Sequence, residues 1–410
     1  MEVLQDTYRT INFGPKEYEV PNEWKILKIK ETSTLKGRIG WQGLTTKEYL
    51  KEGDYFLITG TDFKNGRIDW ENCHFVDQDR FDQDAKIQIK KNDILITKDG
   101  TIGKVAIIAS ELSKPGTLNS GVFVLRPTNK DYLPIFMYYY LNSFFFSSFI
   151  SQIKAGSTIA HLYQKDFEKY TFLVPSIQEQ QKIADILSTV DEQISTTVKI
   201  IKKSKELKKG LMQKLFSEGI GHTEFKDTKI GRIPKDWDLL SVDKCILKKK
   251  FSVGKIPKKE YFKEGSFPII DQSKTFIIGY SNHSELLYNG NLPAIIYGDH
   301  TNHVKYVNQP FICGADGVKI IQPLDELDNK FIYYSILYRK PQSEGYRRHF
   351  SILKEKILCI PTFAEQQEIA SILSEADAKI EKEQTQKTHL EALKKGLMQQ
   401  LLTGKKRVKV

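Results

Sequence analysis

Apolar side chains recur with helical spacing in two long segments of the chain, residues 175–216 and 361–402. In the first segment they stand four, three, four and seven positions apart, at Ile183, Leu187, Val190, Ile194 and Ile201. The second segment repeats the start of this spacing at Ile369, Leu373, Ala376 and Ile380. Such spacing is typical of the seam of a coiled coil. Each segment therefore predicts a long helix, and Glu179–Phe216 alone would extend about 57 Å.

The two helical segments are copies of one another. They align without a gap at an offset of 186 residues, with 19 of 42 positions identical. A weaker echo precedes each copy, where Pro21 and Trp24 match Pro234 and Trp237. Internal repeats of this kind define an architecture. The chain is predicted to comprise a first domain (1–174), a helix (175–222), a second domain (223–360) and a second helix with a basic tail (361–410).

A capping motif marks the expected N-terminus of each helix. Ser176 with Glu179, and Thr362 with Glu365, form the S-x-x-E pattern of a capping box. We expect the helices to pair in antiparallel fashion, with Glu179–Phe216 aligned against Glu365–Leu402 in opposite directions. This alignment brings basic residues of the first helix beside acidic residues of the second. The basic set is Lys199, Lys202, Lys203 and Lys205, and the acidic set is Glu375, Asp377 and Glu381.

Two glycines, Gly210 and Gly396, occupy matching positions in the repeated sequence KKGLM. One interpretation is that they allow two backbones to approach closely. The other is that they kink or end the helices. The sequence does not choose between them.

The intervening domains predict a mixed α/β (α+β) fold. Short β-rich runs separated by turns are found at residues 93–97, 104–109 and 121–125, and again at 294–297, 304–307 and 317–321. An aromatic helix follows in each domain, at residues 136–150 and 331–338. The prediction is two similar domains separated by a long antiparallel two-helix coiled coil, in a pseudo-two-fold arrangement.

One uncharged stretch, residues 132–153, is long enough to span a membrane. It contains Pro134, Asn142 and four serines, and most of its bulk is Tyr and Phe. These residues favour a buried aromatic helix over a membrane span, with the aromatic runs Tyr138–Tyr140 and Phe144–Phe146 in a core.

The charge of the chain favours a polyanionic partner. The net charge is +11, and residues 223–360 contribute 22 basic and 16 acidic side chains. Residues 1–174 are nearly balanced, with 23 basic and 22 acidic, so they bind DNA only if the charges are sorted onto different faces. The four cysteines are far apart, which fits a reducing cytoplasm.

Catalytic and nucleotide-binding motifs are not found. The segment KDGTIGKV at 98–105 lacks the glycine and the hydroxyl residue of a phosphate-binding loop, and we interpret it as a β-turn. There is no nucleophile elbow and no adenine-methyltransferase motif. His300, His303 and Cys313 lack a fourth ligand, so a polar loop is expected there rather than a zinc site.

The repeated QEQQKIADILS and LKKGLMQ segments resemble the central helices of Type I restriction-system specificity subunits. GTIGK, NSGVFVLRP and GSTIAHLYQKDFEKYTFLVP add to the resemblance, which covers essentially the whole chain. In the second domain GYRRHFSILKEKILCIP replaces the last of these segments, so its final loop has no residue-by-residue match.

The resemblance implies a non-catalytic DNA-reading subunit. Each domain would read one half of a bipartite, asymmetric site in double-stranded DNA, and the helices would set the spacer and dock two methyltransferase subunits. S-adenosylmethionine, ATP and magnesium would bind to the methyltransferase and motor/nuclease partners, with no cofactor or metal on this chain. The implied location is the cytoplasm, without a membrane. The helix residues carried over for spacing and docking are Glu179, Gln180, Gln181, Ile183, Leu187, Glu365, Gln366, Gln367, Ile369 and Leu373.

Loops that differ between the domains are the candidates for DNA contact, because Lys and Arg suit phosphates and guanine edges while Asn and Gln suit adenine edges. The first domain offers Lys98, Thr101, Lys104, Asn119, Ser120, Ser157, Thr158, His161 and Gln164. The second offers Lys274, His300, Asn302, His303, Lys305, Arg347, Arg348 and His349.

Other basic segments and other functions stay open. Lys248–Lys250 is either a phosphate patch or a solvated turn, and the tail 405–410 is expected to fray rather than touch DNA. A coiled-coil scaffold that binds only proteins is the alternative function. A self-contained methyltransferase-nuclease is a third, which lacks its motifs.

Overall fold

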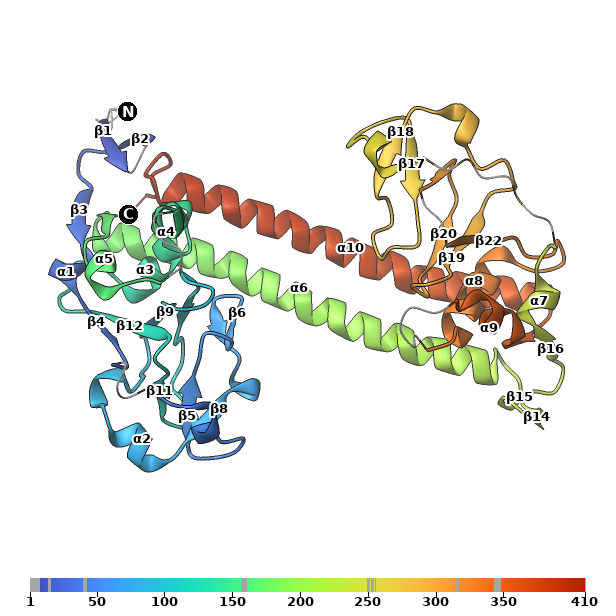
Figure 1. The fold of residues 1–410 in the computed structure, drawn as a ribbon, viewed down its shortest axis with the longest axis horizontal. Coiled ribbons are helices and arrows are strands. Elements are labelled where there is room, and N and C mark those ends of the chain that lie inside the picture. The colour runs from blue at the N-terminus through green and yellow to red at the C-terminus, as the bar shows by residue number, and fades with distance from the viewer. Residues whose placement is uncertain are drawn as a thin grey trace. The chain divides into compact units, whose positions relative to one another are not determined.

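The computed structural model describes residues 8–13, 16–39, 43–155, 161–248, 251, 254, 256–314, 317–342 and 348–409. The chain divides into two compact units (Figure 1). Unit 1 comprises Met1–Thr196 with Lys387–Val410, and unit 2 comprises Thr197–Gln386. Each unit therefore contains one domain, a part of the first long helix and a part of the second.

Unit 1 is a mixed α/β domain with short strands. Its strands are β1 Tyr8–Phe13, β2 Lys16–Pro21, β3 Lys25–Lys28, β4 Ser33–Gly37, β5 Tyr55–Ile58, β6 Phe63–Lys64, β7 Arg67–Ile68, β8 His74–Val76, β9 Ile94–Thr97, β10 Val105–Ile107, β11 Gly116–Leu118, β12 Val122–Pro127 and β13 Thr171–Val174. Its short helices are α1 Ile29–Thr32, η2 Thr46–Glu48, η3 Trp70–Asn72, α2 Gln78–Asp82, η4 Ala85–Ile87, α3 Pro134–Leu141, α4 Phe144–Ala155 and α5 Gln164–Phe167.

A four-stranded antiparallel sheet in the order β10-β9-β12-β4 forms the centre of unit 1. A second sheet, β11-β5-β8, contains a parallel pair, β11 with β5. Strand β9 is buried along its whole length, as a central strand with both faces covered must be.

The predicted aromatic helix is two helices, α3 and α4, because the chain breaks at Asn142 and Ser143. Asn142 caps α3, and its backbone N–H donates to the carbonyl of Tyr138 at 3.1 Å. The aromatic side chains of α3 are buried, as expected, with Phe136, Tyr139 and Tyr140 fully enclosed. Among the described residues, no helix combines the length and the apolar character that crossing a membrane requires.

Unit 2 repeats this plan. Its strands are β14 Phe225–Thr228, β15 Gly231–Pro234, β16 Asp238–Ser241, β17 Phe267–Ile270, β18 Gly279–Ser281, β19 Ala294–Gly298, β20 Val304–Val307, β21 Ile312–Cys313, β22 Val318–Ile321 and β23 Ile357–Ile360. Its short helices are α7 Val242–Cys245, η5 Lys258–Glu260, η6 Ser284–Leu286, α8 Asn329–Arg339 and α9 Phe350–Glu355.

Most strands of the two units correspond, although β4 and the hairpin β6-β7 of unit 1 have no counterpart among the described strands of unit 2. The order β20-β19-β22 matches β10-β9-β12, and β18-β17-β21 matches β8-β5-β11, again with a parallel pair. The hairpin β14-β15 matches β1-β2, and β16-β23 matches β3-β13. The prediction of two similar mixed α/β domains is confirmed.

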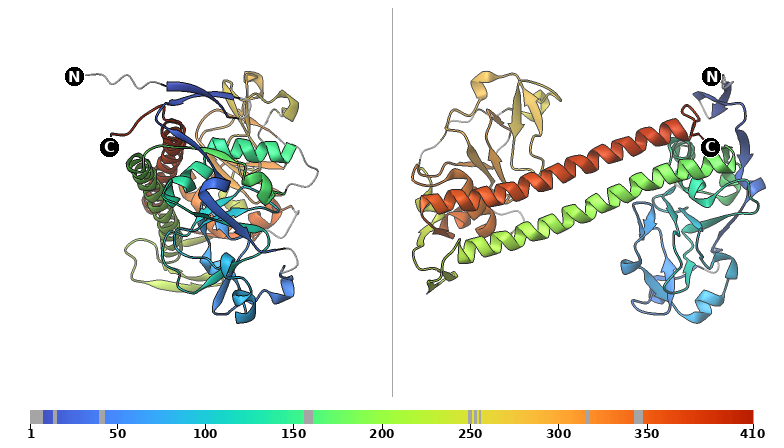
Figure 2. Two further views of the ribbon diagram at one scale, coloured as in Figure 1. Left: turned by 90° about the vertical axis from the view of Figure 1, so that its left-hand side faces the viewer. Right: turned by 180° about the vertical axis from the view of Figure 1, so that it is seen from behind.

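The long helices are α6, Ile177–Glu218, and α10, Phe363–Leu401. Within each unit they lie side by side in both views (Figures 1 and 2). In unit 1 the start of α6 shares a core with the end of α10, through Ile183 and Leu187 with Met398 and Leu402. In unit 2 the start of α10 shares a core with the end of α6. The predicted antiparallel pairing and buried seam are confirmed.

The ion pairs between the helices differ from the predicted ones. Asp377 binds Lys208, and Asp191 binds Lys394, each with a closest N–O distance of 2.6 Å. The lysines predicted to pair, Lys199, Lys202, Lys203 and Lys205, are exposed. In an antiparallel pair of helices, the numbers of facing residues have a constant sum. This sum is 585 for both observed pairs, whereas it is 581 in the expected register. The prediction was wrong by four residues, about one helical turn.

Gly210 and Gly396 lie inside the long helices, and no other described backbone approaches them closely. A methyl group built on either would have no described atom within 4 Å, and neither helix ends there. The close-approach interpretation was wrong. In contrast, Gly219 and Gly404 follow the helix ends with positive φ of 67° and 73°, and each lies against a tryptophan, Trp237 or Trp24.

We predict that Gly210→Ala and Gly396→Ala each raise the free energy of unfolding by about 0.5–1 kcal/mol, because alanine loses less backbone entropy in a helix. Urea denaturation followed by circular dichroism measures this. Gly219→Ala is the matched control and should destabilise, since its φ is positive and its Cβ would lie 2.6 Å from Glu365. Destabilisation by Gly210→Ala would show that the helix needs glycine there.

Candidate nucleic-acid interface

Three segments that are distant in sequence meet at one end of strand β9 in unit 1. The backbone N–H of Lys98 donates to the carbonyl of Gly121 at 2.8 Å, which joins the turn after β9 to the turn before β12. The N–H of Leu162 donates to the carbonyl of Lys98 at 2.9 Å, which adds the segment before α5. The predicted candidates of this domain therefore gather in one place, except Ser157 and Thr158, which lie outside the described residues.

The cationic side chains of this cluster are half-buried at its edge. The Lys98 ammonium lies 4.8 Å from the centre of the Phe123 ring, and burial lowers the pKa of Lys98. Lys104 donates from Nζ to the carbonyl of Gly60 at 3.3 Å. Thr101 is exposed at the tip of the turn. Loops with this mixture suit a contact with phosphates and base edges.

Sequence reasoning missed Asp99 and Tyr49 in this cluster. The Asp99 carboxylate accepts a hydrogen bond from His161 Nδ1, and Tyr49 accepts one from the side-chain amide of Asn119. Asn119 in turn accepts from the backbone N–H of Ser120 at 2.5 Å. Asp99 stands next to Lys98 in the sequence, so its place in the same turn was the available signal.

The corresponding loops of unit 2 are built by the same backbone bonds. Asp299 N–H donates to the carbonyl of Gly317 at 2.7 Å, as Lys98 does to Gly121. His349 N–H donates to the carbonyl of Asp299 at 2.8 Å, as Leu162 does to Lys98. The final loop of the second domain, which the sequence could not match, is thus placed by a shared hydrogen bond.

Three of the predicted DNA-contacting side chains of unit 2 are buried and hold the loops together instead. Asn302 has φ of 57° and accepts from the Tyr297 hydroxyl at 2.6 Å. Lys305 donates to the carbonyls of Asp271 and Thr275 at 2.7 and 2.6 Å, and burial lowers its pKa. His349 is 1% exposed and donates from Nδ1 to the Asp299 carbonyl. All three side chains are buried and bonded within the domain, which speaks against their contact with DNA, although His349 Nε2 has no hydrogen-bond partner among the described residues.

In unit 2 the charges of Lys274, Lys305 and Lys340 act on His303. Its pKa is lowered by burial first and then by the charges of Lys340, Lys305 and Lys274. This shift favours the neutral form of His303, which has both a donor and an acceptor nitrogen. Lys340, which was missed, ends α8 and donates to the Asn302 carbonyl at 3.2 Å. Arg348 is exposed and His300 is half-buried, while Arg347 lies outside the described residues.

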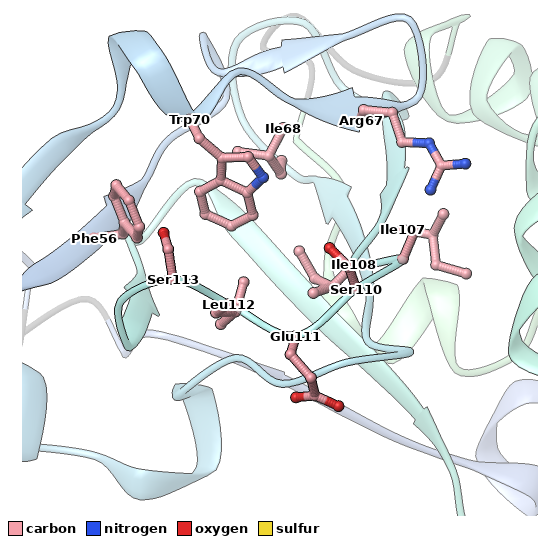
Figure 3. A pocket seen from close by; sticks show the side chains of 11 residues that line it. Phe56, Arg67, Ile68, Trp70, Ile107, Ile108, Ser110, Glu111, Leu112 and Ser113 are labelled. Atoms are coloured by element: carbon pink, nitrogen blue, oxygen red, sulfur yellow. The ribbon is translucent and has the colours of Figure 1, made fainter.

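A hollow of about 440 Å³ in unit 1 lies apart from these loops (Figure 3). Phe56, Trp70 and Leu112 line it, with Arg67 and Glu111 at its sides. It borders the end of β10, where Ile107 pairs with Ile94 at the start of β9. The DNA candidates are at the other end of β9. The hollow is therefore separate from the candidate interface.

The comparisons with known proteins agree with this geometry. The family model described as "Type I restriction modification DNA specificity domain" matches residues 21–206 and 245–392. A putative type I restriction enzyme specificity subunit of Methanocaldococcus jannaschii is 30% identical over the full length of both chains. This chain belongs to the Type I restriction–modification DNA specificity family.

Two further similarities bear on the family fold and its extent. Another Methanocaldococcus jannaschii specificity subunit, MjaVIII, is 28% identical and covers 100% of this chain and 99% of its own. The crystal structure of a Type I system S subunit from M. genitalium superimposes with a TM-score of 0.60, covering 92% of this chain and 96% of that one. At 19% identity this second likeness concerns the fold alone.

In this family member the repeated Glu residues anchor each helix to its own domain. Ser176 caps α6, since its Oγ accepts from the Glu179 N–H at 3.2 Å, but the Glu179 carboxylate does not turn back to the cap. It accepts instead from the Trp24 indole at 3.3 Å and from Arg407 at 2.7 Å. Glu365 likewise accepts from the Trp237 indole at 3.0 Å. Only the first half of each predicted capping box forms.

The repeated Gln residues complete the anchor. Gln180 accepts from the N–H of Leu133 at 2.8 Å and donates to the carbonyl of Pro175 at 3.0 Å. Gln366 accepts from the N–H of Asp328 and donates to Pro361 in the same way. These bonds hold the N-terminal ends of α3 and α8.

The predicted docking set is therefore mostly internal. Its buried or anchoring members are Glu179, Gln180, Ile183, Leu187, Glu365, Gln366, Ile369 and Leu373. Gln181 and Gln367 alone of this set are exposed. Their burial between helix and domain fits the spacer part of the prediction, and the docking of a partner through them stays a prediction.

The basic segments also differ from expectation. The tail does not fray: Arg407 binds Glu179, and Val408 packs against the core of unit 1. Lys248 forms an ion pair with Asp243, while Lys249 and Lys250 lie outside the described residues.

We predict that Asn302→Ala lowers the stability of unit 2 by about 2–3 kcal/mol, because it leaves the Tyr297 hydroxyl without its acceptor and places an alanine at positive φ. Thermal unfolding measures the loss. Arg348→Ala, at an exposed position of the neighbouring loop, should change stability by less than about 0.5 kcal/mol. Equal stability of the two variants would return Asn302 to the DNA-contact candidates.

Proposed function

We propose that this chain is the DNA-reading specificity subunit of a Type I restriction–modification complex, in which each domain reads one half of a bipartite DNA site. The observation that carries the proposal is the match of the DNA-specificity family model to both halves of the chain. Each matched segment contains one of the two loop clusters. The equal framework of the clusters supports equivalent roles for the two domains.

The differences between the clusters support two different half-sites. At one equivalent backbone position unit 1 has Lys98 and unit 2 has Asp299, whose carboxylate accepts from the Phe350 N–H at 2.9 Å. At another, unit 1 has Lys104 and unit 2 has His303. Since base edges are distinguished by their donors and acceptors, loops that differ in this way would read different sequences.

The partners proposed for this chain are two methyltransferase subunits and, in the full complex, motor/nuclease subunits. They would bring S-adenosylmethionine, ATP and magnesium, and this chain would supply no catalytic step. Two matching exposed sites suit identical partners: Leu207 is 62% exposed and Leu393 is 43% exposed, and each precedes an open glycine by three residues on the same helix face.

Sequencing of methylated adenines in cells with and without this chain tests the function. Loss of methylation at one bipartite motif on deletion would support it. The purified chain with S-adenosylmethionine alone should methylate nothing, and addition of the methyltransferase should give methylation at that motif. An unchanged methylation pattern would favour the alternative of a scaffold without base readout.

We predict that Lys98→Met weakens binding to all DNA sequences and reduces the slope of log affinity against log salt by roughly 0.9, the value for one phosphate contact. Fluorescence anisotropy of the assembled complex at several salt concentrations measures the slope. Lys130→Met is the matched control, since exposed Lys130 follows β12 at the opposite end of the β9–β12 pair. An equal slope for both variants would remove Lys98 from the interface.

We predict that Leu207→Glu combined with Leu393→Glu leaves folding intact but weakens methyltransferase binding by about tenfold or more, because exposed apolar anchors dominate such contacts. Analytical ultracentrifugation of the mixture measures it. Lys209→Glu with Lys395→Glu is the control, at exposed positions on another face of the same helices. Full complex formation by the leucine variant would place docking elsewhere.

A further inference from the structure

Two aspartates on the long helices each bind a tyrosine of their own domain and a lysine of the other helix. Asp191 on α6 accepts from the Tyr139 hydroxyl at 2.9 Å and from Lys394 of α10 at 2.6 Å. Asp377 on α10 accepts from the Tyr334 hydroxyl at 2.8 Å and from Lys208 of α6 at 2.6 and 2.7 Å. We call these two groups the Tyr–Asp–Lys clamps.

The two clamps have the same construction. The aspartates are 186 residues apart, and so are the lysines. Each ammonium also faces the ring of its tyrosine, with Lys394 at 5.6 Å and Lys208 at 5.1 Å from the ring centres. Each clamp lies inside one unit and joins three helices, α3, α6 and α10 in unit 1 and α8, α10 and α6 in unit 2.

The clamp lysines are largely shielded from water. The side chain of Lys208 is 17% exposed and that of Lys394 is 23% exposed. The partner carboxylates are more open, since the side chain of Asp191 is 25% exposed and that of Asp377 is 40% exposed. Charge-assisted hydrogen bonds to a shielded ammonium are stronger and less screened by salt than ion pairs between two fully exposed groups. The clamps are therefore better suited than surface ion pairs to hold one helix at a defined position along the other.

The apolar seam alone does not define that position. In the observed register Leu187 aligns with Met398, and Leu373 aligns with Met212. After a slip along the seam, each of these residues could pack against another apolar side chain instead. A slip of one turn toward the register with a sum of 581 would align Lys394 with Leu187 and Lys208 with Leu373. Both leucines are fully buried, so each ammonium would lose its carboxylate and face an apolar surface.

We propose that the two Tyr–Asp–Lys clamps are positioning residues that fix the register of α6 against α10, and through it the spacing between the two halves of the DNA site. This inference rests on the proposed function. A slip of one helical turn is about 5.4 Å, which corresponds to one or two base-pair steps of roughly 3.4 Å. The clamps thus act on the distance between half-sites and not on the bases read.

The test is a double variant, Lys208→Met with Lys394→Met, assembled with the methyltransferase. Methionine keeps the length of the side chain, removes the bond to aspartate and is compatible with a leucine neighbour in the slipped register. Methylation is measured on a DNA library in which the half-sites are constant and the spacer length varies. The preference of the wild-type complex for its best spacer over spacers one or two base pairs different should fall about tenfold or more.

Two matched variants separate register from charge. Lys209→Met with Lys395→Met removes equal charge from exposed neighbouring positions and should keep the wild-type preference. Lys208→Arg with Lys394→Arg keeps the ion pairs and should keep most of it. The half-site sequences should be the same for all variants.

The outcomes distinguish the two proposals. A folded Lys208→Met/Lys394→Met chain with the wild-type spacer preference would overturn the clamp proposal and leave the function intact. A methionine variant that fails to fold by circular dichroism, while the arginine variant folds, would make the clamps purely structural and would also overturn it. A wild-type complex that methylates no bipartite site would refute the proposed function itself.

Discussion

Glu179 and Glu365 each hold three separate segments of the chain together, and the rest of the structure depends on these contacts. Each carboxylate lies in the first turn of a long helix, accepts a bond from the tryptophan of its own domain and meets the segment that follows the other helix. A carboxylate that is removed from water must be bonded on both oxygens, because an unpaired buried charge is costly. Each domain is thereby tied to the start of one long helix and to the segment that follows the other.

This constraint explains why the two domains share a frame and differ in their loops. The strands around β9 and β19, and the backbone bonds that join their loops, must be kept so that α3 and α8 can present their ends to Gln180 and Gln366. The side chains of the turns after Thr97 and Gly298 take no part in these contacts with the long helices. Lys98 of unit 1 is equivalent to Asp299 of unit 2, and Lys104 is equivalent to His303. The backbone bonds that hold the turn are the same in both units.

The elements that the sequence predicts well are those with local or repeated signals. The seam positions, the central strands and the antiparallel direction follow from periodicity and from the 186-residue repeat. The register did not follow, because the sequence shows the opposite charges in the middle of the helices but not the cost of burying Lys208 and Lys394 against leucine. That cost depends on which residues the domains cover, and the sequence does not show this.

The candidate interface was predictable at the level of loops but not of side chains. Asn302, Lys305 and His349 have the residue types of DNA contacts, yet each bonds to a segment 30 to 50 residues away along the chain. These bonds reach Pro341 from Asn302, Asp271 and Thr275 from Lys305, and Asp299 from His349. Only the folded domain shows that these side chains are buried and bonded within it. Lys340 was missed because it lies at the end of a helix, far from His303 in the sequence, and only the fold brings the two residues together.

The same distinction between occupied and free side chains divides the repeated helices into two sets. Glu179, Gln180, Glu365 and Gln366 are repeated because each domain needs its anchor. The sequence LKKGLM is also identical in both copies, yet Leu207 and Gly210 are exposed, as are Leu393 and Gly396. Folding gives no reason to keep an exposed leucine or a helix-weakening glycine twice. Identity without an internal role supports a partner that contacts both helices in the same way, and two equal surfaces would bind two copies of it.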